Sequence, residues 1–153
     1  SAATCDWADL LLPATTWGEK EGTVTNSERR ISRVRTAVSA PSVNEDGPRH
    51  DWQIAVDLAR RLEQRLPLRA ASTLFPYETP EQVWNEHRDS TRGRDLDITG
   101  LSYAQLDAAP QQWPLPEDQT QGAERLYTDG VYPTADGRAR FAALPYTPLA
   151  EER

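Results

Sequence analysis

The clearest hydrophobic pattern along the chain is a helical one that precedes Pro67. Its apolar residues recur at intervals of three and four: Ala55, Leu58, Ala59, Leu62 and Leu66. Such spacing places them on one face of a helix. Asp51 can accept hydrogen bonds from the free N–H groups of the first turn, and Pro67 ends the pattern. The sequence therefore predicts an amphipathic helix over residues 51–66, and its apolar face needs a partner.

A second helix is predicted by its starting residues. Thr79 is suited to the N-cap, Pro80 to the first helical position, and Gln82 to the return hydrogen bond of a capping box. We expect this helix to run from residue 80 to about Arg88.

A third, shorter helix is predicted at 102–108. Ser102 is followed three residues later by Gln105, which again forms a capping box. Leu101 and Leu106 stand at the two positions of a hydrophobic staple, where an apolar residue before the cap packs against one in the first turn.

The strands are expected at the two ends of the chain. The apolar run Leu10–Leu12 stops at Pro13 and predicts a short strand, whereas the following stretch is rich in Thr, Gly, Asn and Ser and predicts a loop. Asp129-Gly130 and Asp136-Gly137 are turn pairs that predict one or two hairpins within residues 125–141. An isolated hairpin is marginally stable in water, so this end needs a cover.

These elements predict an α+β chain with a few short helices, long loops, a short N-terminal strand and C-terminal hairpin elements. Residues 1–35 are expected to hold the end of a sheet strand and a loop beside a cofactor. Residues 36–120 are expected to be helical and loop, and residues 121–153 to begin a truncated β domain. The Ser-Ala-Ala start and the lack of any Met indicate a piece cut from a longer protein.

Composition restricts the class of protein further. Hydrophobic residues make up 37% of the chain and there are 12 Pro and 8 Gly, so the core should be small. The net charge of -7 argues against nucleic-acid binding, which needs a basic surface. No apolar run is long enough for a membrane span and no signal peptide is visible, so we expect no membrane partner and a cytoplasmic location.

Few residues have obvious catalytic chemistry. Cys5 is the only cysteine, which excludes a four-cysteine cluster site within this chain and favours a structural thiol. His50 and His87 are more easily explained as solvated or helix-end residues than as ligands. A basic cluster around Glu28, consisting of Arg29, Arg30, Arg33 and Arg35, could hold an anion. Local ion pairs with Glu19, Glu21 and Glu28 are the more common outcome for such a cluster.

One string carries a family resemblance. Residues 8–30 read Ala-Asp-Leu-Leu-Leu-Pro-Ala-Thr-Thr-Trp-Gly-Glu-Lys-Glu-Gly-Thr-Val-Thr-Asn-Ser-Glu-Arg-Arg. This string resembles the segment of molybdopterin oxidoreductases that leaves the parallel sheet of their third domain. The form Thr-Asn-Ser-Glu-Arg-Arg-Ile-Ser is most like the assimilatory nitrate reductase branch. Asp51-Trp52, Gly100–Tyr103, Gln112–Pro114 and Asp136–Phe141 follow in the family's order.

The resemblance implies an internal fragment of an enzyme that reduces nitrate to nitrite in nitrate assimilation. The parent would hold molybdenum in a bis(molybdopterin guanine dinucleotide) cofactor, together with a [4Fe-4S] cluster. No position here matches the catalytic, cluster-binding or metal-ligating residues of the family, so the isolated chain should carry no cofactor and be inactive. Its partners would be the remaining domains of the parent and an electron donor protein or subunit.

The resemblance also assigns one cofactor-binding residue. Asp9 resembles the acidic residue that contacts a guanine of the cofactor, and a carboxylate can accept two hydrogen bonds from that base. A strand-end carboxylate that caps backbone groups is the alternative. Asn26, Arg29 and Arg30 are interpreted as structural or domain-interface residues. Two other functions stay open: the same family with formate as its substrate, or an interaction module that is not an enzyme.

Overall fold

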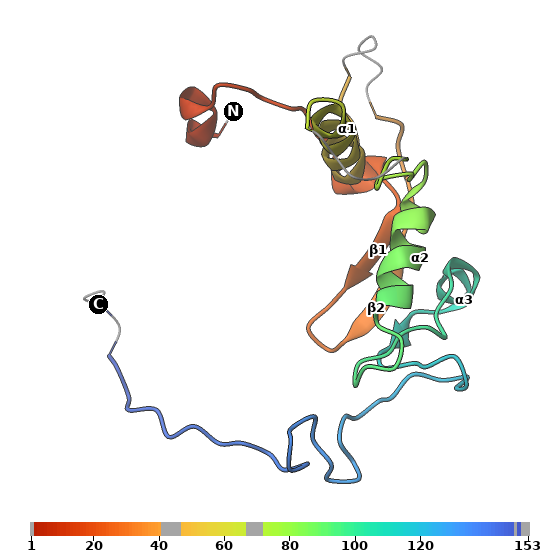
Figure 1. Cartoon of the computed structure of the whole chain (residues 1–153), viewed down its shortest axis with the longest axis vertical. Helices are drawn as coiled ribbons and strands as arrows, with labels where there is room; N and C mark the ends of the chain where they lie inside the picture. Colours follow the sequence, from red (N-terminus) through yellow and green to blue (C-terminus); the bar gives the residue numbers. More distant parts are fainter. Residues whose placement is uncertain (1, 41–46, 67–71, 149, 151–153) are drawn as a thin grey trace. The chain divides into compact units, whose positions relative to one another are not determined.

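The computed structural model describes residues 2–40, 47–66, 72–148 and 150. It separates into two compact units, Ser1–Ala123 and Glu124–Arg153, which we describe individually. The first unit contains three α-helices and a three-stranded antiparallel sheet among its described residues (Figure 1). The predicted α+β class is therefore confirmed.

The three predicted helices are present. They are α1 (Asp51–Glu63), α2 (Pro80–Ser90) and α3 (Tyr103–Ala108). The predicted capping boxes of α2 and α3 are confirmed, because Thr79 Oγ1 accepts from the Gln82 N–H at 3.3 Å and Ser102 Oγ from the Gln105 N–H at 3.2 Å.

The bounds predicted for α1 were partly wrong. The helix is capped by His50, whose own N–H donates to Gln53 Oε1 at 3.1 Å, and Asp51 is the first helical residue. It ends at Glu63 instead of residue 66, and the residues after it form a turn in which the Leu66 N–H donates to the Leu62 carbonyl at 2.9 Å. The side-chain Oε1 of Glu63 accepts from the Leu74 N–H at 2.8 Å. Pro67, the predicted stop, lies outside the described residues.

The sheet lies where the sequence predicts a loop, so that prediction was wrong. Strands β1 (Gly22–Thr25) and β2 (Arg30–Val34) form an antiparallel hairpin in which Val24 is opposite Ser32. Strand β3 (Gln111–Gln112) pairs with the other edge of β2, opposite Arg30 and Ile31. The Thr and Ser residues that indicated a loop are acceptable in a half-exposed hairpin, since only Ile31 of these two strands is buried.

The strands predicted at the two ends do not form among the described residues. Leu10–Leu12 is extended and has no partner strand; the nearest pairing is an isolated parallel bridge between Ala14 and Arg49. In the second unit, the Asp129-Gly130 turn is present, with Gly130 at φ 74°, but its flanks form no ladder. A turn signal sets the direction of the chain, whereas a ladder also needs a covered apolar face.

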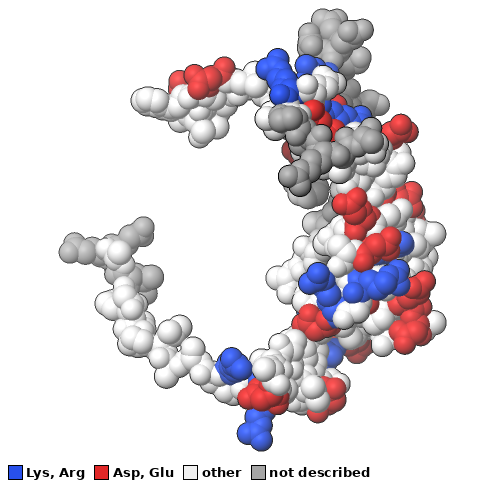
Figure 2. All heavy atoms as spheres, in the orientation of Figure 1, with Lys and Arg blue, Asp and Glu red and all other residues white. Residues whose placement is uncertain are grey.

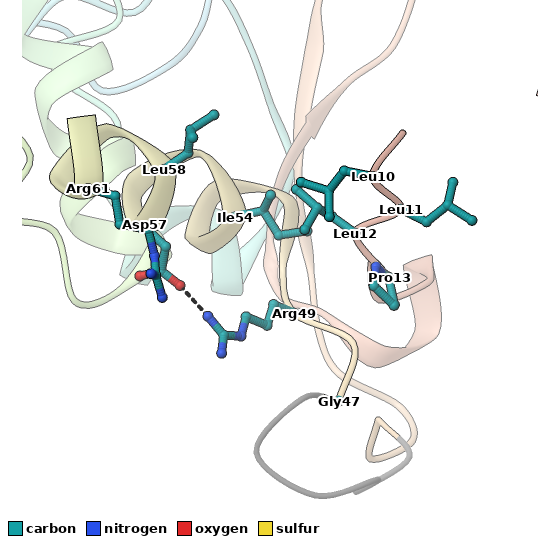
Figure 3. Close-up of a pocket in the computed structure, with 10 residues that line it drawn as sticks. All are labelled: Leu10, Leu11, Leu12, Pro13, Gly47, Arg49, Ile54, Asp57, Leu58 and Arg61. Carbon is teal, nitrogen blue, oxygen red and sulfur yellow. Dashed lines mark hydrogen bonds and ion pairs between the residues drawn. The ribbon is translucent and has the colours of Figure 1, made fainter. Parts of the chain in front are cut away.

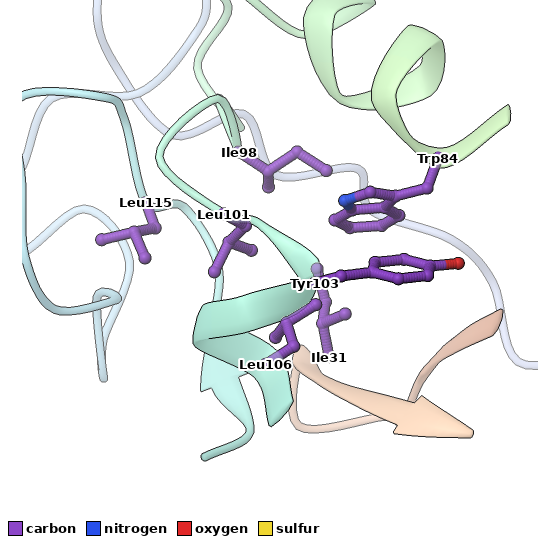
Figure 4. Packing of buried hydrophobic residues seen from close by; sticks show 7 residues of the cluster. All are labelled: Ile31, Trp84, Ile98, Leu101, Tyr103, Leu106 and Leu115. Atoms are coloured by element: carbon purple, nitrogen blue, oxygen red, sulfur yellow. The ribbon is translucent and has the colours of Figure 1, made fainter. Parts of the chain in front are cut away.

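The core of the first unit is small and lies between the sheet, α2 and α3 (Figure 4). Its buried members are Ile31, Trp84, Ile98, Leu101, Tyr103, Leu106 and Leu115. The rings of Trp84 and Tyr103 are tilted by 37° at a centroid distance of 6.4 Å, and Trp113 packs against the cluster. Helix α1 contributes nothing to this cluster. It buries Val56, and its polar attachments include hydrogen bonds from the Arg60 guanidinium to the carbonyls of Phe75 at 2.9 Å and Tyr77 at 3.1 Å.

Gly22 begins β1 with a backbone φ of 153°, a positive angle that side-chain-bearing residues rarely adopt. Nothing lies within 4 Å of a Cβ built at this position, so a substitution there is resisted by the backbone angle and not by crowding. We expect Gly22→Ala to destabilise the chain by about 1–3 kcal/mol. Denaturant unfolding measures this cost. Gly18→Ala is the control, since its added Cβ would make only an ordinary 3.7 Å contact with Val38. An unchanged free energy of unfolding in Gly22→Ala would contradict the prediction.

Candidate functional site

The first part of the family string is attached to the beginning of α1. Thr15 is buried, and its N–H donates to the Arg49 carbonyl at 3.0 Å. Its hydroxyl lies 3.0 Å from His50 Nδ1, so His50 is a helix-cap residue held by Thr15. Lys20 forms an ion pair with Asp51, and the hydrogen bond from Lys20 lowers the pKa of the Asp51 carboxyl below its usual value. These contacts fix the string against the helix.

The second part of the string is a tight turn organised by Asn26. Its side-chain oxygen accepts from the N–H groups of Glu28 at 3.1 Å and Arg30 at 3.0 Å, which holds the β1–β2 connection closed. Its side-chain amide donates to Glu28 Oε1 at 3.1 Å. That hydrogen bond, followed by the hydrogen bond and charge of Arg30, lowers the pKa of Glu28. The structural interpretation of Asn26 is thus supported by its contacts.

Arg29 links this turn to a distant loop. Its backbone adopts a φ of 66°, which is unusual for a residue with a side chain. The guanidinium donates to the carbonyl of Trp113 and, from two nitrogens, to the carbonyl of Ala123 at 3.2 Å. It also lies 5.5 Å from the centre of the Trp113 ring. These partners could not be predicted from the sequence, because two of them are backbone carbonyls.

The basic cluster is neutralised by local acids. Arg33 stacks over Tyr103 at 3.6 Å from the ring centre, and its side chain is buried between Asp107 at 3.1 Å and Glu21 at 3.6 Å. Arg35 also pairs with Asp107 at 2.8 Å, and Arg30 with Glu28 at 3.3 Å. The ion pairs with Glu21 and Glu28 were predicted. A pair with Glu19 was also predicted, but the third acid that pairs with the cluster is Asp107. Figure 2 shows basic and acidic side chains lying next to one another on the same face.

A pocket lies between the apolar run Leu10–Leu12 and helix α1 (Figure 3). Its volume is about 480 Å³ and its wall on the helix includes Ile54 and Leu58. Arg49 and Asp57 also line it, and they form an ion pair at 2.6 Å. This pocket was not predicted from the sequence. The signal for it is the helical repeat itself, since Leu58 belongs to the apolar face that needs a partner.

Asp9, the predicted cofactor contact, directly precedes this pocket wall. Its side chain is exposed, and its carboxylate accepts no hydrogen bond from any residue that the structure describes. The alternative role, capping of nearby backbone groups, is therefore absent among those residues. A free carboxylate has the chemistry to accept the paired N–H donors of a guanine. Asp9 therefore has the chemistry to bind a guanine of the cofactor, and this role stays a prediction.

Metal-ligand chemistry is absent from the part of the chain that the structure covers. Among residues 2–40, 47–66, 72–148 and 150, no group of three or more His, Cys, Asp or Glu could hold a metal ion. His87 packs against Trp84 at a ring distance of 6.0 Å, and Cys5 is a free thiol. No helix in the same residues is both long and apolar enough to cross a membrane.

Sequence comparisons identify the class of protein. Residues 1–61 match the model of the molybdopterin oxidoreductase family. This range contains residues 8–30, among them Asp9, and every residue of the pocket wall. The chain belongs to this family of enzymes. Among its relatives is an assimilatory nitrate reductase of Haloferax mediterranei, 38% identical over 153 residues. The assimilatory nitrate reductase catalytic subunit of Bacillus subtilis is 36% identical over 146 residues.

A relative of another activity is also similar to this chain. The F420-dependent formate dehydrogenase subunit alpha of Methanocaldococcus jannaschii is 32% identical over 148 residues. The comparisons with the Haloferax, Bacillus and Methanocaldococcus proteins cover 97%, 95% and 97% of this chain. The chain spans about a fifth of the length of these relatives, 20%, 19% and 20% in turn.

Proposed function

We propose that this chain is a segment of the catalytic subunit of a nitrate reductase. The observation that carries the proposal is the order of similarity: two nitrate reductases named as assimilatory are 38% and 36% identical, against 32% for the formate dehydrogenase subunit. The parent enzyme converts nitrate, two electrons and two protons into nitrite and water. Its electrons come from a separate donor protein or subunit, in the cytoplasm.

The parent holds a molybdenum bis(molybdopterin guanine dinucleotide) cofactor and a [4Fe-4S] cluster. The cofactor, when bound, supplies the centre that takes an oxygen atom from the substrate. The contribution of this chain is recognition, because Asp9 offers an unpaired carboxylate to a guanine. Lys20, Asp51, Thr15 and His50 hold the segment that carries Asp9 against α1.

The test is an assay of the parent polypeptide, expressed with its cofactors. Nitrite formation from nitrate with a reduced viologen dye is the expected result, without dye reduction by formate. Formate oxidation in place of nitrate reduction would favour the second candidate, which rests on the 32% identity to the formate dehydrogenase subunit. A parent that contains no molybdenum would contradict both.

Asp9 can be tested in the same parent enzyme. We expect Asp9→Ala to weaken cofactor retention by about 1.5–3 kcal/mol, the usual contribution of a charged hydrogen-bonding group. That loss corresponds to roughly a 10- to 100-fold weaker binding. Molybdenum content after dialysis measures it. Asp6→Ala is the matched control, because Asp6 is an equally exposed carboxylate three residues earlier. Equal molybdenum content in both variants would make Asp9 a structural residue only.

A further inference from the structure

Four leucines form an apolar surface that nothing in the described chain covers. We call Leu10, Leu12, Leu58 and Leu62 the leucine surface. Their exposed fractions are 73%, 52%, 54% and 47%, which is high for residues of this type. Leu58 and Leu62 belong to the face of α1 that the sequence predicts to need a partner. The opposite face of the helix is already used, since Val56 there is only 6% exposed.

The two halves of this surface are continuous. Leu10 and Leu12 line the 480 Å³ pocket together with Leu58, and an adjoining hollow of about 250 Å³ is lined by Leu58 and Leu62. Hydrogen bonds fix the extended run beside the helix, because Arg49 donates to the Pro13 carbonyl at 3.1 Å and accepts from the Thr15 N–H. Figure 3 shows Leu10 and Leu12 facing Ile54 across the pocket.

The wall of the pocket is mainly apolar. Its charged residues are Arg49 and Asp57, which form an ion pair at 2.6 Å, and Arg61. Leu10–Leu12 also make no backbone hydrogen bond to any described residue. A partner that fits would therefore bring apolar side chains and free backbone N–H and C=O groups, which is the chemistry of another protein segment.

We propose that the remainder of the parent polypeptide covers the leucine surface, so that α1 is a buried helix between two layers in the complete enzyme. The inference rests on the proposal that the chain is one segment of a longer enzyme. Two observations select this occupant over a second copy of the chain. About four fifths of the length of each relative lies outside the aligned segment. All residues that line the larger pocket lie within residues 1–61, the part that matches the family model, so this pocket lies in a segment that the family shares.

The experiment measures the accessibility of these side chains in the parent enzyme. Leu58→Cys and Leu62→Cys are made separately, treated with a maleimide reagent in the native state, and the labelled peptide is quantified by mass spectrometry. Ser90→Cys is the control, because Ser90 is an exposed residue at the end of α2 and the replacement is nearly isosteric. We expect both leucine positions to react at least ~100-fold more slowly than residue 90, because buried sites react only during rare local openings.

Each outcome has a distinct meaning. Protection that persists when the enzyme is diluted supports the proposal. Labelling as fast as at residue 90 in a folded parent overturns it, and protection that is lost on dilution to a monomer overturns it in favour of a second copy. Hydroxyl-radical oxidation of Leu58 and Leu62 in the unsubstituted parent gives the same answer if a variant does not fold. If the unsubstituted parent does not reduce nitrate but residues 58 and 62 are protected, the proposed substrate is contradicted and the proposal that the leucine surface is covered still holds.

Discussion

Gly122→Ala is expected to unfold the 97–123 region of this chain, with a loss of about 4 kcal/mol or more of stability. A Cβ at this position would lie 1.7 Å from the Gln112 carbonyl oxygen and 2.7 Å from its carbon. Both are backbone atoms of β3, so neither can move away as a flexible side chain could. Their displacement would also break the pairing of Gln112 with Arg30 and the position of the Ala123 carbonyl that Arg29 binds.

Chemical denaturation of the 153-residue chain, followed by circular dichroism and tryptophan fluorescence, measures the effect. Gly93→Ala is the appropriate control. Gly93 has a φ of 71°, but nothing lies within 4 Å of a Cβ there, so only the strain of the backbone angle is expected, about 1 kcal/mol. Gly122 does not have a positive φ, so a loss in Gly122→Ala no larger than that in Gly93→Ala would contradict the predicted clash with Gln112.

The sequence predicts the helices of this chain better than its sheet, and the reason is the range of the interactions. The caps at Thr79 and Ser102 act on N–H groups three residues away, so the pattern that encodes them is visible locally. The β1–β2 hairpin is local, but its Thr and Ser residues indicated a loop. The third strand, β3, is a two-residue strand that pairs with β2 from far along the chain. No local pattern in Gln111-Gln112 indicates that pairing.

The hairpins predicted within residues 125–141 failed for a different reason, because there the local signal was correct and the burial was missing. Asp129-Gly130 does form a turn, as the local sequence indicates, but Phe141, Leu144 and Tyr146 are 95%, 84% and 88% exposed. With its apolar residues uncovered, the segment lacks the burial that makes a hairpin stable. A turn can be predicted from two residues, whereas the stability of a hairpin depends on what covers it.

The candidate site was predictable only where the family string could be recognised. Its residues make two sorts of contact: Asn26 closes a local turn, and Arg29 reaches the carbonyls of Trp113 and Ala123. The local role follows from the side-chain chemistry of Asn. The role of Arg29 does not, since any exposed Arg in a basic cluster could equally remain solvated. Asp9 is the converse case, with a role suggested by resemblance and a carboxylate still without a partner among the described residues.

Leu101→Ala should give the second large loss, about 2–5 kcal/mol, because it removes a fully buried side chain from a small core. Leu101 is 0% exposed and Leu106 is 2% exposed, and both belong to the core cluster, as the predicted hydrophobic staple requires. The cavity would open beside Ile98 and Leu115. The backbone there is held by two hydrogen bonds: the Gly100 N–H donates to the Leu115 carbonyl at 2.9 Å, and the Leu115 N–H donates to the Asp97 carbonyl at 2.8 Å. Backbone held in this way cannot collapse into the space, which places the expected cost in the upper half of the range.

The measurement is again denaturant unfolding of the 153-residue chain, with Leu74→Ala as the matched control. Leu74 carries the same side chain but is 59% exposed, so its truncation leaves no cavity and should change stability by less than about 0.5 kcal/mol. Leu101→Met, which conserves volume, should recover most of the loss. If Leu101→Ala and Leu74→Ala were equally mild, the cluster around α3 would not be a packed core in solution, and the helix would then depend on its capping box alone.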